Sequence, residues 1–303
     1  MMTGLNPTSE QLLNSINAAQ ANLNRAQQQV SSGLRVSRAS DDPAVIADIL
    51  QTRSDLAQVT QVSNNLSLVK SEVDTADTGL QNAVQLMEQA GVLALQGTNT
   101  TMTAGARATL AQQVAGILQQ MVTISRTQVH GIYIFSGDQT STPPYELDST
   151  GVKQIATAPA TRLIQDTSGL TFAVSKTAQE LFDARDSGQN PTAENVFAAL
   201  QGLKTALLAN DPVAIQSAAA AINTAHDYLN DNAGFYGGVQ QRVATALDLA
   251  QKFETQDQTR LSSEQDADIA AAALQITQDT THINAAMASA AKQITTSLFD
   301  YMR

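Results

Sequence analysis

The sequence contains no cysteine and no tryptophan, and aromatic residues make up only 4% of its 303 positions. Without cysteine, the chain can form neither disulfides nor thiolate metal sites. The scarcity of aromatic residues disfavours a thick aromatic core and suits thin helical seams of small side chains. No apolar run approaches the ~18 residues that a membrane-spanning helix requires.

Basic side chains are also scarce, because 17 Lys and Arg residues stand against 28 Asp and Glu residues, giving a net charge of −11. Nucleic acids and anionic membranes attract basic patches, so we expect neither nucleic-acid binding nor membrane insertion. Residues 1–7 have no basic segment followed by an apolar segment, so we expect no cleavable secretory signal. The length fits about two domains of ~150 residues.

Apolar and small side chains recur in alternating steps of four and three near both ends of the chain. This heptad spacing keeps one face of a helix against a partner helix. We therefore predict two terminal helices that pair as a coiled coil and serve as the assembly interface. The predicted interface residues are Leu12, Ile16, Leu23 and Val30 near the N-terminus, and Ile269, Ile276, Ile283, Met287, Ile294 and Leu298 near the C-terminus.

Five residues are predicted to cap or end helices. Gly33 is expected to end the N-terminal helix in the left-handed conformation. Asp42 followed by Pro43 predicts the next helix start, because the missing N–H of proline costs nothing in a first turn. Ser262, with a glutamine three residues later, predicts the start of the C-terminal helix. Gly238, the last glycine of a glycine-rich stretch, predicts a break.

Between the ends, helical periodicity changes to short strand-like runs and then returns. The predicted fold is therefore mainly α, a long antiparallel helical bundle or coiled coil built from both chain ends, with a small β-rich inserted domain. Gly131 to Gly137 is the first predicted strand. The predicted divisions are an N-terminal assembly helix and loop (1–42), two parts of a helical bundle (43–135 and 192–260), a β-rich surface domain (136–191) and a C-terminal assembly helix (261–303).

Residues with catalytic or metal-binding chemistry are sparse. His130, His226 and His282 are far apart, and none has the spacing of paired metal ligands. Asp266 and Asp268 resemble half of a calcium loop but lack its glycine and distal glutamate, so an acidic first helical turn is the better interpretation. The β-rich insert has no paired acid and base residues. We therefore predict no enzymatic activity, no cofactor and no metal site.

The terminal seams have two interpretations, the core of a bundle within one chain or a surface between copies of the chain. Narrow apolar stripes at the extreme ends, surrounded by Gln, Asn, Ser and Thr, favour the surface between copies. Heptads of this composition would also permit a cytoplasmic coiled-coil adaptor or signalling protein.

Three short stretches resemble the signatures of the bacterial flagellin superfamily. Residues 31–36 (Ser-Ser-Gly-Leu-Arg-Val) and 41–44 (Asp-Asp-Pro-Ala) are similar to its N-terminal signature. Residues 266–270 are similar to its C-terminal signature, and 238–242 resemble a short element before its last helix. Outside these, residues 131–145 and the ending 297–303 resemble the members at the hook–filament junction more than filament flagellin.

The resemblance implies a structural protein of the bacterial flagellum that forms the junction between hook and filament, with filament flagellin as the alternative. It implies an extracellular location reached through the flagellar type III export channel without a cleavable signal. The implied partners are other copies of the chain, the first hook-associated protein, flagellin, and an export chaperone that binds the C-terminal helix. It also implies terminal helices that form nested coiled coils in the assembled tube.

Overall fold

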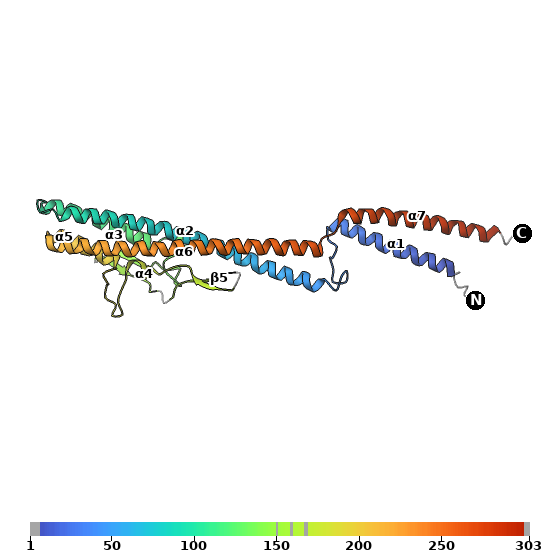
Figure 1. Cartoon of the computed structure of the whole chain (residues 1–303), viewed down its shortest axis with the longest axis horizontal. Helices are drawn as coiled ribbons and strands as arrows, with labels where there is room; N and C mark the ends of the chain where they lie inside the picture. The colour runs from blue at the N-terminus through green and yellow to red at the C-terminus, as the bar shows by residue number, and fades with distance from the viewer. Residues whose placement is uncertain (1–6, 150, 158–159, 167–168, 300–303) are drawn as a thin grey trace. The chain divides into compact units, whose positions relative to one another are not determined.

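The computed structural model describes residues 7–149, 151–157, 160–166 and 169–299. Its helices are α1 (Pro7–Ser32), α2 (Ile46–Gly97), α3 (Ala104–Ser125), α4 (Ala178–Phe182), α5 (Val196–Ala209), α6 (Pro212–Gln265) and α7 (Ile269–Phe299) (Figure 1). Its strands are β1 (Gln128–Val129), β2 (Ile132–Tyr133), β3 (Tyr145–Asp148), β4 (Gly151–Gln154), β5 (Leu163–Gln165) and β6 (Thr171–Ala173). The protein is mainly α with a small strand-containing region, which confirms the predicted fold class.

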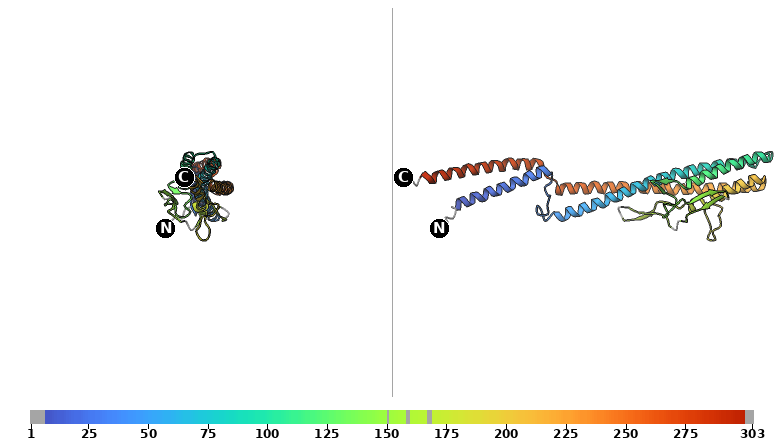
Figure 2. Two further views of the ribbon diagram at one scale, coloured as in Figure 1. Left: turned by 90° about the vertical axis from the view of Figure 1, so that its left-hand side faces the viewer. Right: turned by 180° about the vertical axis from the view of Figure 1, so that it is seen from behind.

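The chain divides into two compact units. Unit 1 contains Met1–Gln58 and Phe253–Arg303, and so holds α1, α7 and the adjoining ends of α2 and α6. Unit 2 is Val59–Lys252, in which the long helices α2 and α6 run antiparallel (Figure 2). The five-part division drawn from the sequence remains a prediction.

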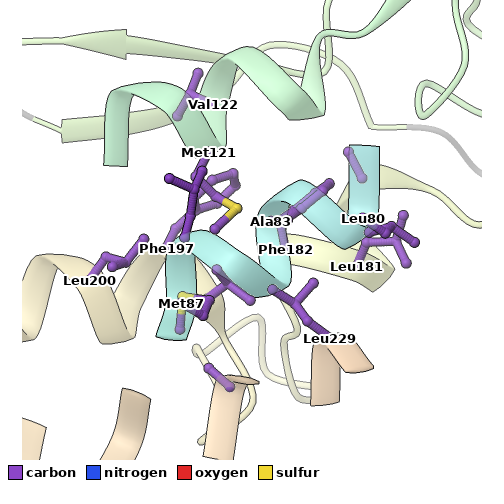
Figure 3. Close-up of a cluster of buried hydrophobic side chains, with 14 of the residues drawn as sticks. Leu80, Ala83, Met87, Met121, Val122, Leu181, Phe182, Phe197, Leu200 and Leu229 are labelled. Carbon is purple, nitrogen blue, oxygen red and sulfur yellow. The ribbon is translucent and has the colours of Figure 1, made fainter. Parts of the chain in front are cut away.

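One apolar core holds unit 2 together, with side chains from α2, α3, α4, α5 and α6. Figure 3 shows part of this cluster, in which Met87, Met121, Phe182 and Phe197 gather between the helices. The rings of Phe182 and Phe197 stack with centroids 5.9 Å apart. Burying one such large side chain stabilises a fold by about 1.5–3 kcal/mol. The few aromatic residues of the sequence are therefore concentrated where they stabilise unit 2.

The strands form three separate two-stranded antiparallel ribbons, β1–β2, β3–β4 and β5–β6. The last ribbon is fastened to the helices, because Phe172 lies under the guanidinium of Arg242, 4.2 Å from the ring centroid. Next to the ribbon, Arg162 Nη1 lies 2.5 Å from Glu72 Oε2 on α2. These contacts hold a short ribbon that is marginal alone in water.

The strand predicted over 131–137 is wrong in extent. Only Ile132 and Tyr133 pair, with β1. Phe135 is fully buried, and its carbonyl accepts a hydrogen bond from the N–H of Ala178 at 2.7 Å. The chain leaves the ribbon here because the helical core takes up the Phe135 ring.

The predicted helix break at Gly238 is also wrong, because α6 continues without interruption from Pro212 to Gln265. Tyr236, Val239 and Val243 are buried at steps of three and four, the spacing of one helical face. A glycine inside a helix costs about 1 kcal/mol relative to alanine. Burial of these three side chains outweighs that cost, so the glycine-rich stretch stays helical.

Replacing Gly238 with alanine is expected to stabilise the protein by about 0.5–1 kcal/mol, because alanine favours the helix. A Cβ atom at Gly238 meets no atom within 4 Å. A control is Gly97→Ala, whose Cβ would lie 2.6 Å from Leu207 Cδ2 and should destabilise unit 2. Thermal unfolding measures both, and a destabilised Gly238→Ala protein would contradict a continuous α6.

Ser262 does not cap the C-terminal helix as predicted, because it lies within α6, where its hydroxyl donates to Asp266 Oδ2 at 2.5 Å. Helix α7 starts later, at Ile269. The side chain of Asp268 accepts a hydrogen bond from the N–H of Ala271 at 3.0 Å, so Asp268 caps this helix. The helix starts later than predicted because the backbone at Gln265 and Ala267 forms hydrogen bonds with the loop that follows α1. These bonds separate α6 from α7, and the sequence pattern around Ser262 does not reveal them.

Candidate assembly site

Helices α1 and α7 lie side by side and antiparallel in unit 1 (Figures 1 and 2). Their facing positions alternate by four and three, which is the spacing of a coiled-coil seam. The seam residues are Leu12, Ile16, Ala19, Leu23 and Ala26 on α1, and Ala272, Ile276, Asp279, Ile283 and Ala286 on α7. Most of them are small or only half-buried, so the seam is thin.

The predicted interface residues fall into two groups in the structure. Those turned toward the partner helix are Leu12, Ile16, Leu23, Ile276 and Ile283. Those left exposed are Val30, Ile269 and Met287, by 38%, 45% and 55%. Ile294 and Leu298 also belong to α7, but their side chains lie outside the part of the chain that the structure describes. A role in assembly remains a prediction for all ten.

The exposed group on α7 follows one flank of the seam. Ile269, Ala273, Thr280 and Met287 succeed one another in steps of four and seven, and all are exposed. At ~100° per residue, they lie about 60–100° around the helix from the inward face. The flank gives α7 a wider apolar surface than α1 covers, which a further helix would be able to bury.

Two connectors bind one another where α1 and α7 begin to pair, and we call this contact the clasp. Gly33, with φ of +72°, ends α1 and donates its N–H to Gln29 C=O at 2.8 Å. The carbonyl of Gly33 accepts the N–H of Ala267 at 2.9 Å, and the N–H of Arg35 donates to Gln265 C=O at 2.7 Å. The loop after α1 is therefore joined to the linker between α6 and α7.

The guanidinium of Arg35 closes the clasp. Its Nη2 donates to the carbonyl of Glu264 at 2.6 Å, and its Nη1 donates to Asp42 Oδ2 at 2.9 Å. Asp42 also precedes Pro43, and its carbonyl accepts the N–H of Ile46, where α2 begins. The predicted helix start at Pro43 is thus a turn that leads into α2 three residues later.

Carboxylates on the loop are held in the charged form. The Arg35 hydrogen bond lowers the pKa of Asp42 below its ordinary value. Backbone N–H groups of Arg38 and Ser37 lower the pKa of Asp41 in the same way. Because both folded-state pKa values are lowered, these bonds stabilise the loop above the ordinary pKa of aspartate. Their contribution is lost as the pH falls through the lowered values.

Sequence reasoning did not single out Arg35 as a site residue. Its two partners, Asp42 and Glu264, lie 7 and 229 positions away, so no local spacing connects the three. The available signal was the arginine within the flagellin-like signature at 31–36.

Replacing Arg35 with lysine is expected to lower the stability of the clasp by about 1–2 kcal/mol. The reason is that an ammonium lacks the planar fork with which a guanidinium serves two acceptors. Hydrogen exchange at the backbone amides of position 35 and Ala267 should accelerate roughly 5–30-fold. Arg53→Lys, at an exposed residue of α2, is the control and should leave these amides unchanged. Equal protection in both variants would show that the guanidinium does not hold the connectors.

Within the described ranges, no three His, Asp or Glu residues are placed to hold a metal ion. Among the same residues, no helix is long and apolar enough to span a membrane.

The family of the bacterial flagellin N-terminal helical region matches residues 5–140. Flagellar hook-associated protein 3 of Salmonella typhimurium is 27% identical over 256 residues, which cover 78% of this chain and 77% of that protein. A flagellin of Clostridium tyrobutyricum is 28% identical over 127 residues, which cover 42% of this chain and 34% of the flagellin.

A similar fold occurs in the crystal structure of a flagellar junction protein from Legionella pneumophila. The two structures superpose with a TM-score of 0.55 at 14% identity, over 66% of this chain and 100% of the other. This chain is similar to proteins of the bacterial flagellin superfamily, both in its N-terminal helical region and, more extensively, to a flagellar hook-associated protein 3.

Proposed function

We propose that this chain forms the junction between the hook and the filament of a bacterial flagellum, through coiled-coil packing of α1 and α7. Its relatives are structural proteins of the flagellum and not enzymes, and the chain is of the same class. The observation that carries the proposal is the incomplete α1–α7 pair, in which Ile269 and Met287 remain about half exposed.

The physical basis is burial on assembly. Apolar surface removed from water stabilises by ~25 cal/mol per Å², and ordering a residue costs about 1–2 kcal/mol of backbone entropy. A thin seam makes α1–α7 pairing weak in a single chain. Packing of the exposed flank against neighbouring copies adds the burial that one chain lacks, so order at the ends is coupled to assembly.

Filament flagellin is the alternative within the same superfamily. The similarity to hook-associated protein 3 extends over 78% of this chain, whereas the similarity to the flagellin covers 42%. This difference favours the junction. Abundance separates the two roles in cells, because a junction ring needs few copies and a filament needs many.

The flagellar assignment implies association with other flagellar components and a location in the flagellum. We propose in addition that the chain binds copies of itself, the first hook-associated protein and flagellin. We also propose that it leaves the cell through the flagellar export channel without a cleavable signal, while a chaperone binds α7. The absence of disulfides and the thin α1–α7 seam suit a chain that must unfold for export.

Electron microscopy of a strain that lacks this chain tests the proposal. We expect hooks that end without filaments, together with flagellin released into the medium. Complementation with the full-length gene should restore filaments. Filaments of normal length in the deletion strain would contradict the junction role, and filaments built from this chain would identify it as flagellin.

A further inference from the structure

A buried carboxylate occupies the middle of the α1–α7 seam. Asp279 is 4% exposed and lies between the inward residues Ile276 and Ile283 on α7. Gln275 of the same helix donates to its Oδ2 at 2.9 Å. Among the described residues, no basic side chain forms an ion pair with it. A polar residue at a core position weakens a coiled coil, so its presence calls for a compensating role.

The surroundings of Asp279 on α1 follow from the clasp. Gly33 and Ala267 are hydrogen-bonded and so lie at one level, and both helices rise ~1.5 Å per residue. Asp279 is 12 residues beyond Ala267, and 12 residues before Gly33 is Ala21. Asp279 thus lies near the level of Ala21, where the inward residues of α1 are the uncharged Ala19 and Leu23.

Charged groups near this level are few. Helix α1 contains only Glu10 and Arg25 as charged residues. By the same count, Glu10 lies about 16 Å along the helix from Asp279, and Arg25 lies about 6 Å away on the exposed side of α1. On α7, His282 is exposed one turn beyond Asp279. Nothing acidic on α1 therefore opposes Asp279 when the two helices pair.

Parallel pairing of α7 with α7 of a second copy would bring two acidic side chains together. Two copies of α7 related by an axis parallel to the helices would lie in register, with both Asp279 side chains in one core layer. Like charges within a dry seam repel strongly, whereas the isoleucines on either side would suit such a pair well. The apolar residues of α7 therefore suit both the antiparallel pair with α1 and the parallel pair with a second α7. The carboxylate opposes only the parallel pair.

We propose that Asp279 determines the partner of α7, permitting antiparallel pairing with α1 and preventing parallel pairing with α7 of a second copy. The cost is a weaker seam. The benefit is that free chains do not associate through α7 before they reach the site of assembly. This role requires only the α1–α7 geometry, so its failure would leave the flagellar assignment intact.

The test compares variants of the purified full-length chain by sedimentation velocity over a range of concentrations. Asp279→Leu and Asp279→Asn remove the charge and should dimerise at about tenfold lower concentration than the unchanged protein. Asp279→Glu keeps the charge and should remain monomeric. Thr280→Leu, at the exposed neighbouring position, is the control for added apolar surface.

Hydrogen exchange at Ile276 and Ile283 monitors the pairing with α1 in each variant. Dimers of the two neutral variants, with monomeric Asp279→Glu and Thr280→Leu proteins, would support the proposal. Neutral variants that self-associate no more than the unchanged protein would overturn it. Faster exchange without dimers in the neutral variants would also overturn it, because the carboxylate would then be stabilising the α1–α7 pair.

Discussion

Replacing Ile283 with aspartate is expected to abolish incorporation of the chain at the hook, leaving cells with hooks but without filaments. Ile283 is 7% exposed in the α1–α7 seam and lies one helical turn from Asp279. The substitution places a second carboxylate in the same seam without a cation. An uncompensated buried charge costs about 3–5 kcal/mol, which is more than a thin seam supplies.

The same substitution should leave unit 2 folded, because Ile283 does not belong to its core. Urea unfolding of unit 2 and electron microscopy of the cells give the two readouts. Asn284→Asp is the matched control, since it adds the same charge at an exposed position beside Ile283. If the cells with Ile283→Asp grow filaments as well as the control cells, α1–α7 pairing is not required for assembly.

Replacing Asp183 with alanine is expected to destabilise unit 2 by about 3–5 kcal/mol. Its buried carboxylate accepts hydrogen bonds from the Tyr145 hydroxyl at 2.9 Å, from Arg185 Nη2 at 2.6 Å and from Asn195 Nδ2 at 2.7 Å. Burial raises the pKa of Tyr145 well above its ordinary value, so its hydroxyl remains a donor. Alanine would remove this acceptor from all three groups, and only Asn195 Nδ2 would keep another one, the Ala184 carbonyl at 3.2 Å.

Two further variants make the Asp183 result specific. Asp183→Asn keeps one acceptor oxygen and should lose less stability than alanine. Glu194→Ala, at an exposed residue just before α5, should change the unfolding free energy by less than about 0.5 kcal/mol. Comparable stability of the alanine and control proteins in urea would show that the network contributes little to unit 2.

Periodicity alone predicted that both ends of the chain are helical, because the interval between apolar residues is a local property of the sequence. The same periodicity did not show that Ile276 faces α1 while Met287 is exposed. Both positions fit one heptad stripe, and the partner selects which side of that stripe is buried. Gly238 was misread for a related reason, since its helical state depends on burial of Tyr236 in a core that forms only on folding.

Local sequence patterns did not predict contacts between residues that lie far apart in the sequence. Asp183 receives a hydrogen bond from Tyr145, 38 positions earlier, and nothing near either residue indicates the other. The clasp is the same kind of feature, since Arg35 reaches a carbonyl 229 positions away. Short signatures resembling flagellin marked the stretch that contains Arg35 without indicating what its side chain binds.

Because α1 and α7 lie near opposite ends of the chain, the ribosome synthesises α1 long before its partner helix. Helix α7 begins 237 residues after α1 ends (269 − 32). At ~5–20 residues per second, a ribosome completes α1 roughly 10–50 s before it starts α7. During that interval α1 has no intramolecular partner, and the clasp cannot close. The modest apolar content of α1 then limits association between nascent chains, because α1 exposes few large apolar side chains while synthesis continues.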